Sequence, residues 1–410
     1  MRGFSRRRFL QLAGAASLGG LSRLRAVDAM PAAANGMAAG RADGLTLFLC
    51  GDVMTGRGID QILPHPGDPR LHESYVRDAR DYLALAEDAS GPIARPVDFA
   101  YIWGDALAEL RTAAPDLRIV NLETAVTAGG ERWRKGIHYR MHPDNIPCLG
   151  AAAIDCCVLA NNHVLDWGYA GLEDTLAALD RAGIRHTGAG RDAAAAAAPA
   201  LLEVPGKGRV LVFACGLQSS GVDPEWAASA RRPGVNRLPD LGTAGVDDIA
   251  GRIRCVRRPG DVVVVSLHWG GNWGYTVPAE QRAFAHALID TAGVDVVHGH
   301  SSHHVKGIEV YRERPILYGC GDFLNDYEGI GGYETYRGEL GLMYFPQLDP
   351  ASGRLLRFGM TPTRIRRLRV DRAAPAETRW LAEVLNREGK VLGTSVIPGD
   401  DGRLELRWRQ

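Results

Sequence analysis

Short apolar runs alternate with segments of helical periodicity along most of the chain, starting at Leu45. The runs are rich in Val, Ile and Leu over their whole length, which is typical of strands covered on both faces of a sheet. The segments between them carry apolar residues at helical spacing, and two of them end at a glycine. This alternation predicts an α/β domain. The predicted strands that precede polar motifs are 45–50, 117–120, 155–160, 262–267 and 294–297.

The pattern continues to the C-terminus without an internal repeat or a second segment of linker composition. We therefore expect residues 45–410 to form one domain. The other predicted elements are helices near 172–183, 193–198, 278–293 and 376–387, and strands at 340–345, 355–360, 363–370 and 404–408.

The composition excludes several classes of protein. The 410 residues include 48 Lys+Arg and 48 Asp+Glu, and this zero net charge argues against a dedicated nucleic-acid binder. A hydrophobic fraction of 46% and a charged fraction of 23% are those of a globular protein. No uncharged apolar run reaches the roughly 20 residues that span a bilayer. Seven cysteines form no disulfide scaffold, and buried, unreactive thiols are the favoured interpretation.

Residues 1–34 have the layout of an export signal. A basic stretch at 5–8 is followed by an uncharged apolar stretch up to Ser22 and by three alanines at 32–34. The paired arginines before Phe-Leu resemble the twin-arginine export motif, and an ordinary secretory signal or an amphipathic start is the alternative. Residues 35–44 predict a flexible linker. We therefore expect an extracytoplasmic protein in the periplasm or cell envelope, attached to the membrane only if the signal is not cleaved.

Each of the five strands ends on side chains that can bind a metal ion or transfer a proton. The carboxyl ends of strands in α/β sheets meet at one edge, so we expect these side chains to form a single site. Six of the twelve histidines lie in these segments, which incidental core histidines would not explain. Carboxylate, amide and imidazole ligands suit one or two divalent ions of Mn, Fe or Zn. The predicted ligands are Asp52, Glu123, Asn162, His268, His300 and His303.

His163 follows Asn162 directly, so its side chain leaves the backbone toward another side of the loop. We predict that His163 is catalytic and protonates the leaving oxygen, while Asp166 holds its imidazole in one tautomer. Alternatively, His163 and Asp166 only fix the loop that enters the next helix. The alternative interpretation of the predicted ligands is that they are turn residues, helix caps or surface residues. His298, His303 and His304 lie close together in the sequence and compete for the same role as a metal ligand.

The order of these motifs resembles that of the calcineurin-like metallophosphatases. Within that superfamily the closer resemblance is to the CapA family, and it covers roughly residues 45–330. The motifs that carry it are Gly51-Asp52-Val53-Met54, Asn121-Leu122-Glu123, Asn161-Asn162-His163, His268-Trp269-Gly270, Gly299-His300-Ser301-Ser302-His303 and Gly321-Asp322-Phe323.

The resemblance implies a four-layer α/β/β/α sandwich with metals at the strand ends. CapA proteins are associated with poly-γ-glutamate capsules, which implies an anionic polymer as ligand and capsule-assembly proteins of the envelope as partners. Met54 stands where metallophosphatases place a metal-binding His, and Glu123 replaces a bridging Asp. A single-metal or degenerate site is therefore the alternative to a two-metal site. A phosphoesterase with a phosphorylated substrate and a non-catalytic scaffold are the alternative functions.

Five arginines lie between Thr363 and Arg372. Charged side chains on an edge strand discourage pairing with other chains, which is the plain interpretation of this segment. An electropositive rim that attracts an anionic polymer is the alternative.

Overall fold

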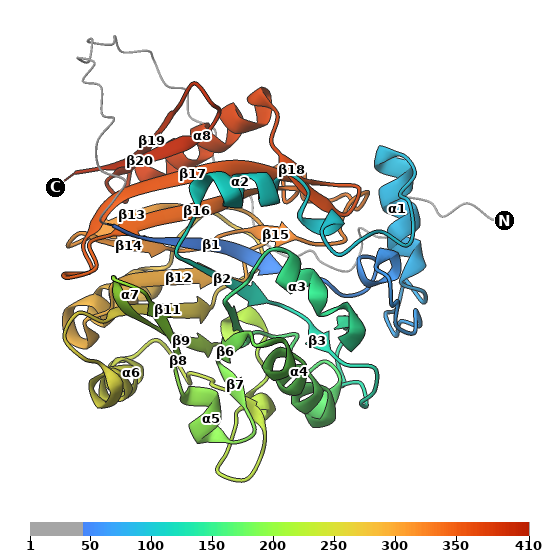
Figure 1. Cartoon of the computed structure of the whole chain (residues 1–410), viewed down its shortest axis with the longest axis horizontal. Helices are drawn as coiled ribbons and strands as arrows, with labels where there is room; N and C mark the ends of the chain where they lie inside the picture. The colour runs from blue at the N-terminus through green and yellow to red at the C-terminus, as the bar shows by residue number, and fades with distance from the viewer. Residues whose placement is uncertain (1–43, 410) are drawn as a thin grey trace.

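The structure is a computed structural model that describes residues 44–409 (Figure 1). The predicted signal at 1–34 and all of the predicted linker at 35–44 except Gly44 lie outside the described residues. In the described part of the chain, two sheets of ten and six strands pack against each other. Among these residues there is no helix with the length and apolar character needed to cross a bilayer.

The first strand of the domain lies at the centre of the larger sheet. β1 (Leu45–Val53) pairs in parallel with β2 (Leu117–Leu122) and antiparallel with β16 (Leu340–Leu348). The C-terminal strands therefore extend the sheet that the N-terminal strand begins. In spatial order, this sheet contains β19 (Thr394–Pro398), β20 (Leu404–Trp408), β17 (Leu355–Arg366), β16, β1, β2, β5 (Cys156–Val158) and β6 (Arg185–Thr187), with β15 (Asp322–Leu324) beside β1 and β18 (Arg369–Arg372) beside β17.

The smaller sheet shows why its strands are apolar throughout. In β11 (Val262–His268), Val262 and Val264 belong to the core shared with the larger sheet, whereas Val263 and Val265 belong to the core under α6 and α7. β11 thus buries both of its faces, whereas β8 at the edge of the sheet alternates buried and exposed residues. The spatial order is β13 (Ile308–Tyr311), β14 (Arg314–Leu317), β12 (Val296–His300), β11, β9 (Gly208–Gly216) and β8 (Ala200–Val204); the short pairs are β3 (Ala125–Val126) with β4 (Arg140–Met141) and β7 (Ala189–Gly190) with β10 (Gly234–Val235).

Helices cover the outer faces of the sheets and complete the four layers. α6 and α7 contribute Ile249, Phe284 and Leu288 to the core beneath the smaller sheet, and α4 contributes Leu172 and Leu176 to the core of the larger sheet. The predicted α/β/β/α fold class is confirmed. The helices are α1 (Arg80–Ser90), α2 (Ala106–Ala113), α3 (Pro147–Ala151), α4 (Gly168–Ala182), α5 (Ala193–Ala197), α6 (Thr243–Val256), α7 (Ala279–Ala292) and α8 (Pro375–Gly389).

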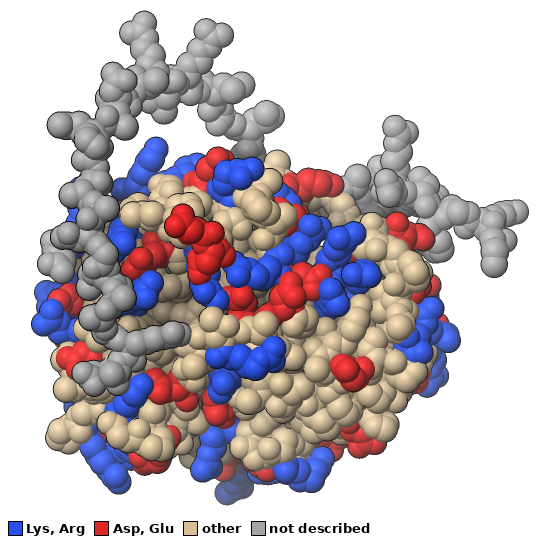
Figure 2. Space-filling view, turned by 45° about the horizontal axis from the view of Figure 1, so that its top comes forward, with Lys and Arg blue, Asp and Glu red and all other residues tan. Residues whose placement is uncertain are grey.

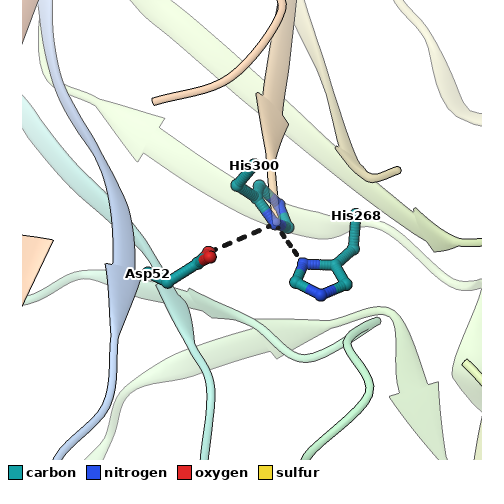
Figure 3. A group of neighbouring side chains, drawn as sticks. All are labelled: Asp52, His268 and His300. Carbon is teal, nitrogen blue, oxygen red and sulfur yellow. Dashed lines mark hydrogen bonds and ion pairs between the residues drawn. The ribbon is translucent and has the colours of Figure 1, made fainter. Parts of the chain in front are cut away.

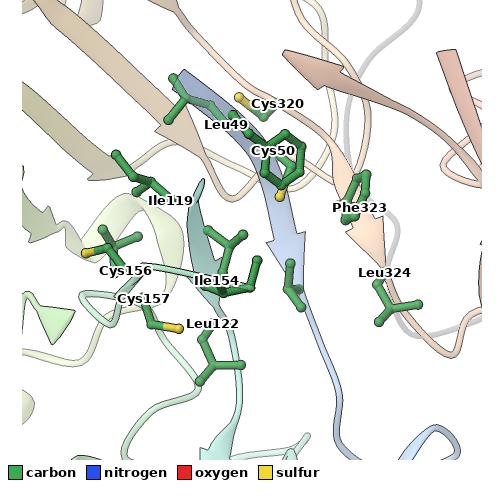
Figure 4. Packing of buried hydrophobic residues seen from close by; sticks show 14 of the residues in the cluster. Leu49, Cys50, Ile119, Leu122, Ile154, Cys156, Cys157, Cys320, Phe323 and Leu324 are labelled. Carbon is green, nitrogen blue, oxygen red and sulfur yellow. The ribbon is translucent and has the colours of Figure 1, made fainter. Parts of the chain in front are cut away.

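Cysteines are part of the apolar core of the larger sheet. Figure 4 shows Cys50, Cys156, Cys157 and Cys320 among leucine, isoleucine and phenylalanine side chains. All seven cysteines are free, and burial raises the pKa of Cys156 above its ordinary value. The core cysteines therefore pack as small apolar side chains.

One predicted boundary near the C-terminus is wrong. The sequence pattern predicts separate strands at 355–360 and 363–370, but β17 runs without a break from Leu355 to Arg366. A turn at Arg367 and Leu368 then leads into β18, and both turn residues have φ of 54°. This left-handed conformation usually requires Gly or Asn. Neither residue occurs in this turn, so the sequence gives no signal for it.

Gly51 lies where β1 approaches the backbone that enters β15. A Cβ atom added to Gly51 would lie 1.6 Å from the carbonyl oxygen of Gly321. Gly51→Ala must therefore separate the two strands, and we expect it to lower the free energy of unfolding by about 3 kcal/mol. Gly359→Ala in β17 is the control, because a Cβ there meets nothing within 4 Å. Equal stability of the two variants in urea unfolding would contradict this interpretation.

Candidate metal centre

Asp52 lies near the carboxyl end of β1, directly opposite Asp322 of β15 in the parallel pairing. Both carboxylates are buried. Burial and the neighbouring Asp322 carboxylate raise the pKa of Asp52 to about 7. Asn121 Nδ2 donates to Asp52 Oδ1 at 2.7 Å and the backbone nitrogen of Ser301 donates to Oδ2 at 3.2 Å. These donors fix the orientation of the Asp52 carboxylate.

A first group of ligands forms where β11 and β12 end beside β1. His268 and His300 are paired in register, and their Nδ1 atoms lie 2.7 Å apart. His300 Nδ1 lies 3.6 Å from Asp52 Oδ1 (Figure 3). Burial lowers the pKa of both histidines well below the ordinary value, so both rings are neutral. Neutral imidazoles and a carboxylate are the ligand types that divalent transition metals prefer.

A second group shares the same aspartate. Asp52, His303 and Asp322 each offer one ligand atom, and these atoms lie within 4.8 Å of one another. His303 Nδ1 lies 2.9 Å from Asp322 Oδ1, and Asn325 Nδ2 donates to Asp322 Oδ2 at 2.7 Å. Burial alone would lower the pKa of His303, but the Asp322 carboxylate outweighs burial and raises it. The Asp52 carboxylate therefore belongs to both groups of potential metal ligands.

Glu123 and Asn162 complete this cluster of side chains. Glu123 Oε1 lies 3.7 Å from His268 Nε2, and Asn162 Oδ1 lies 2.8 Å from the same nitrogen. Burial, with the Asp52 carboxylate nearby, raises the pKa of Glu123 well above its ordinary value. The structure thus brings all six predicted ligands to one connected cluster at the strand ends.

His163 lies between Asp166 and Glu123. Its Nδ1 atom lies 2.7 Å from Asp166 Oδ2, and its Nε2 atom lies 3.9 Å from Glu123 Oε1. Burial lowers the pKa of His163 to about 4, so the ring is neutral at neutral pH. With its hydrogen on Nδ1 and donated to Asp166, the ring presents a lone pair at Nε2. The ring thus faces the centre with one nitrogen held by Asp166, and the predicted role of His163 in protonating the leaving oxygen stays a prediction.

The neighbouring histidines have structural roles. His298 Nε2 lies 2.8 Å from the carbonyl oxygen of Cys50 in β1, so His298 links the two sheets. His304 Nε2 accepts a hydrogen bond from the backbone nitrogen of Gly274 at 3.1 Å, and its ring stacks on Trp273. Of the three competing C-terminal histidines, the structure brings His303 to the centre.

Sequence reasoning missed two side chains of this region as site residues. Asp322 belongs to a short motif, but β15 has only three residues and shows no strand pattern. Lys135 Nζ donates to Asp166 Oδ1 at 2.7 Å and to the backbone carbonyl of Asn162. Lys135 lies in a loop rich in Arg and Lys, so residue type gives no signal that distinguishes it.

The arginine segment between Thr363 and Arg372 is largely neutralised by acidic side chains. Figure 2 shows blue and red side chains interspersed over the face that it draws. This pairing argues against an electropositive rim, and the edge-strand interpretation fits β18 with Arg369 and Arg372 but not Arg364, which lies in β17 between β16 and β18. The ion pairs are Arg364 with Glu377 at 3.0 Å, Arg369 with Asp371 at 2.8 Å and Arg372 with Glu109 at 3.0 Å.

A cavity of about 760 Å³ opens onto the centre. Its size is that of sites for small ligands. Its walls beyond the centre are rich in aromatic side chains. The cavity is lined by Glu123, Asn162, His163, Ser301 and His303 at the centre, by Lys135 beside them and by Arg57, Trp273, Tyr327, Tyr333 and Arg364, among others.

Two packed sheets between helical layers, with carboxylates and histidines gathered at the strand ends, define a metallophosphatase-like α/β protein. The model of the family described as "Bacterial capsule synthesis protein PGA_cap" matches residues 46–327. The chain belongs to this family, which confirms the resemblance found in the sequence.

Named relatives agree with this assignment. A probable polyglutamine synthesis accessory protein of Mycobacterium tuberculosis is 51% identical over 370 residues, which cover 90% of this chain and 97% of the relative. The capsule biosynthesis protein CapA of Bacillus anthracis is 27% identical over 287 residues, covering 69% of this chain and 60% of the relative. The PGA biosynthesis protein CapA of Bacillus subtilis is 27% identical over 287 residues, which cover 69% of this chain and 64% of the relative.

Proposed function

We propose that this chain is a metal-dependent hydrolase that acts outside the cytoplasm in the synthesis of a glutamate-type capsule polymer. Family membership and the names of the relatives support the capsule role. The observation that carries the enzymatic part is the Asp52 carboxylate, which belongs to two potential metal-binding groups beside a cavity of about 760 Å³.

The donor set fits divalent cations. Asp52, Glu123 and Asp322 bury three carboxyl groups together, and no described Lys or Arg forms an ion pair with any of them. Such a cluster is unfavourable unless a positive charge compensates it. Oxygen and imidazole nitrogen ligands in this mixture suit Mn, Fe or Zn. Asp52, His268 and His300, with Glu123 and Asn162 beside them, would hold one ion, and Asp52, His303 and Asp322 would hold another.

The chemistry follows from the groups around the centre. A bound divalent cation would polarise the scissile carbonyl or phosphoryl group. His163 Nε2 accepts a proton from the attacking water and returns it to the leaving group, while Asp166 holds the imidazole in one tautomer. The cavity orients the substrate and keeps bulk water from the reacting atoms.

The proposed substrate is the anionic polymer itself, and the proposed partners are capsule-assembly proteins of the envelope. The twin-arginine signal would deliver the folded protein, and an uncleaved signal would be its contact with the membrane. A phosphorylated substrate is the second candidate, because the metallophosphatase-like fold favours phosphoester chemistry. Nucleic acid is not a proposed partner.

Metal analysis of the purified chain tests the centre directly. After incubation with Mn, Fe or Zn and dialysis, we expect two ions per chain in the wild type and one in Asp322→Asn, because Asp322 belongs to a single ligand group. Asp155→Asn is the control, since Asp155 is a partly buried aspartate that contacts the backbone nitrogen of Arg118 away from the centre. A wild type that binds no metal would contradict the proposal.

A hydrolase screen then separates the two substrate classes. The metal-loaded protein is incubated with γ-glutamyl oligomers and, in parallel, with phosphomonoesters and phosphodiesters. Cleavage of the oligomers is the expected result, and cleavage of phosphoesters alone would favour the second candidate. A metal-loaded chain that is inactive on both classes would make the chain a metal-binding scaffold.

A further inference from the structure

Lys135 brings a positive charge to the wall of the cavity beside the centre. Its Nζ atom lies 2.7 Å from Asp166 Oδ1 and 3.3 Å from His163 Nδ1, and it also contacts the backbone carbonyl of Asn162. The ring of Trp226 lies 5.2 Å away on another side. The side chain is 22% exposed and lines the cavity together with Glu123. The ammonium group is therefore fixed in place yet accessible from the cavity.

The hydrogen bonds of Lys135 leave one donor unused. An ammonium group has three hydrogens. Asp166 and the carbonyl of Asn162 accept two of them. The Asp166 carboxylate can only accept, so its 2.7 Å contact with His163 Nδ1 assigns the ring hydrogen to Nδ1, which is then no acceptor for the third. No other protein acceptor for Lys135 occurs among residues 44–409, and the third hydrogen remains available to a ligand.

The other cationic side chains that line the cavity in the described chain, those of Arg57 and Arg364, form ion pairs with acidic side chains. Arg57 lies between two acids, 2.8 Å from Glu73 and 2.5 Å from Asp326. Arg364 pairs with Glu377 at 3.0 Å. Lys135 differs from both in its position, because its Nζ atom contacts the backbone carbonyl of Asn162 and lies 3.3 Å from His163 Nδ1, directly beside the centre. Of the cations that line the cavity in the described chain, Lys135 is the best placed to receive an anion next to the centre.

We propose that Lys135 binds an anionic oxygen of the substrate, a carboxylate or phosphate group, beside the metal centre and so determines specificity for charged substrates. This inference rests on the proposed function, because the same cavity holds the substrate. A charge-assisted hydrogen bond from an ammonium to such an oxygen is stronger than a neutral one. Lys135 can supply such a bond at this point of the cavity, because its Nζ atom lies 3.3 Å from His163 Nδ1 at the centre.

Calorimetric titration tests the inference with two probes, inorganic phosphate and γ-glutamyl-glutamate. Both are titrated into wild type, Lys135→Met and Lys135→Arg, first with Mn-loaded and then with metal-free protein. We expect Lys135→Met to weaken binding of at least one probe about 10-fold to 100-fold. Lys135→Arg should restore most of the affinity because it keeps the charge. Metal affinity and melting temperature should remain close to wild type in both variants.

The two probes distinguish the source of the anion. A loss confined to phosphate assigns Lys135 to a phosphoester substrate, and a loss confined to the dipeptide assigns it to the polymer. Equal affinity of wild type and Lys135→Met for both probes would overturn the inference, even if two ions bind. Weakened metal binding in Lys135→Met with unchanged probe affinity would also overturn it, because Lys135 would then only hold the Asn162 loop. Failure of the wild type to bind metal refutes the proposed function instead, and the metal-free titrations still decide the role of Lys135.

Discussion

The Asp52→Asn variant is expected to bind neither metal ion. Asp52 is the residue shared by the group with His268 and His300 and by the group with His303 and Asp322. An asparagine keeps the size of the side chain and an oxygen that can accept from Asn121, but it removes the negative charge. Loss of a ligand at both positions should lower metal affinity by more than roughly 100-fold, which exceeds the usual effect of a residue that only supports a ligand. Elemental analysis after dialysis measures this directly.

Stability provides a second readout of the same variant. A metal that binds only the folded chain stabilises the wild type by about 2.7 kcal/mol at 100 times its dissociation constant. Asp52→Asn should gain nothing from added metal. Without metal, Asp52→Asn should be more stable than the wild type. The variant removes one of three neighbouring buried carboxyl groups, and Asp52 and Asp322 repel each other when charged. An equal response of both proteins to metal in thermal unfolding would show that Asp52 is no ligand.

Strand patterns predicted the five strands that precede polar motifs, and the motifs at their ends named the six candidate ligands, whereas β8 and β9 of the smaller sheet were not predicted and the two-sheet architecture came from the family resemblance. His268 and His300 illustrate why the motifs point to candidate ligands, because each ends an apolar run whose parallel pairing brings the strand ends together. Asp322 could not be derived in this way. It reaches Asp52 through a strand of three residues that follows Gly321, and only the folded pairing of β15 with β1 shows the contact.

Lys135 illustrates a different limit of sequence reasoning. Its position depends on where the loop between β3 and β4 crosses the loop that contains Asn162, and no periodicity encodes such a crossing. The turn at Arg367 and Leu368 was missed for a related reason, since its left-handed backbone is imposed by the pairing of β17 with β18. Loop positions are fixed by tertiary contacts rather than by local pattern.

The structure also answers a question raised by Met54. Metallophosphatases place a metal-binding His at this position, and a thioether is a poor ligand for borderline or hard cations. Here Met54 is buried and its sulfur contacts the hydroxyl of Tyr327 at 3.8 Å. His303 and Asp322 each offer a ligand atom within 4.8 Å of one from Asp52, and so supply the second group of ligands without Met54. This is the physical reason for proposing two ions despite the departure from the metallophosphatase pattern.

The His163→Ala variant should retain both metal ions and lose most of its turnover. His163 lies beside the ligands, but its Nδ1 atom is held by Asp166 and its Nε2 atom is 3.9 Å from Glu123. Removal of a positioned proton-transfer group lowers turnover by roughly 10²- to 10⁴-fold. The substrate is the one that the hydrolase screen identifies, and metal content is measured on the same samples. His186→Ala is the control, because His186 pairs with Asp180 away from the centre. Loss of metal together with activity would make His163 a ligand, whereas full activity would show that His163 and Asp166 only fix the loop before α4.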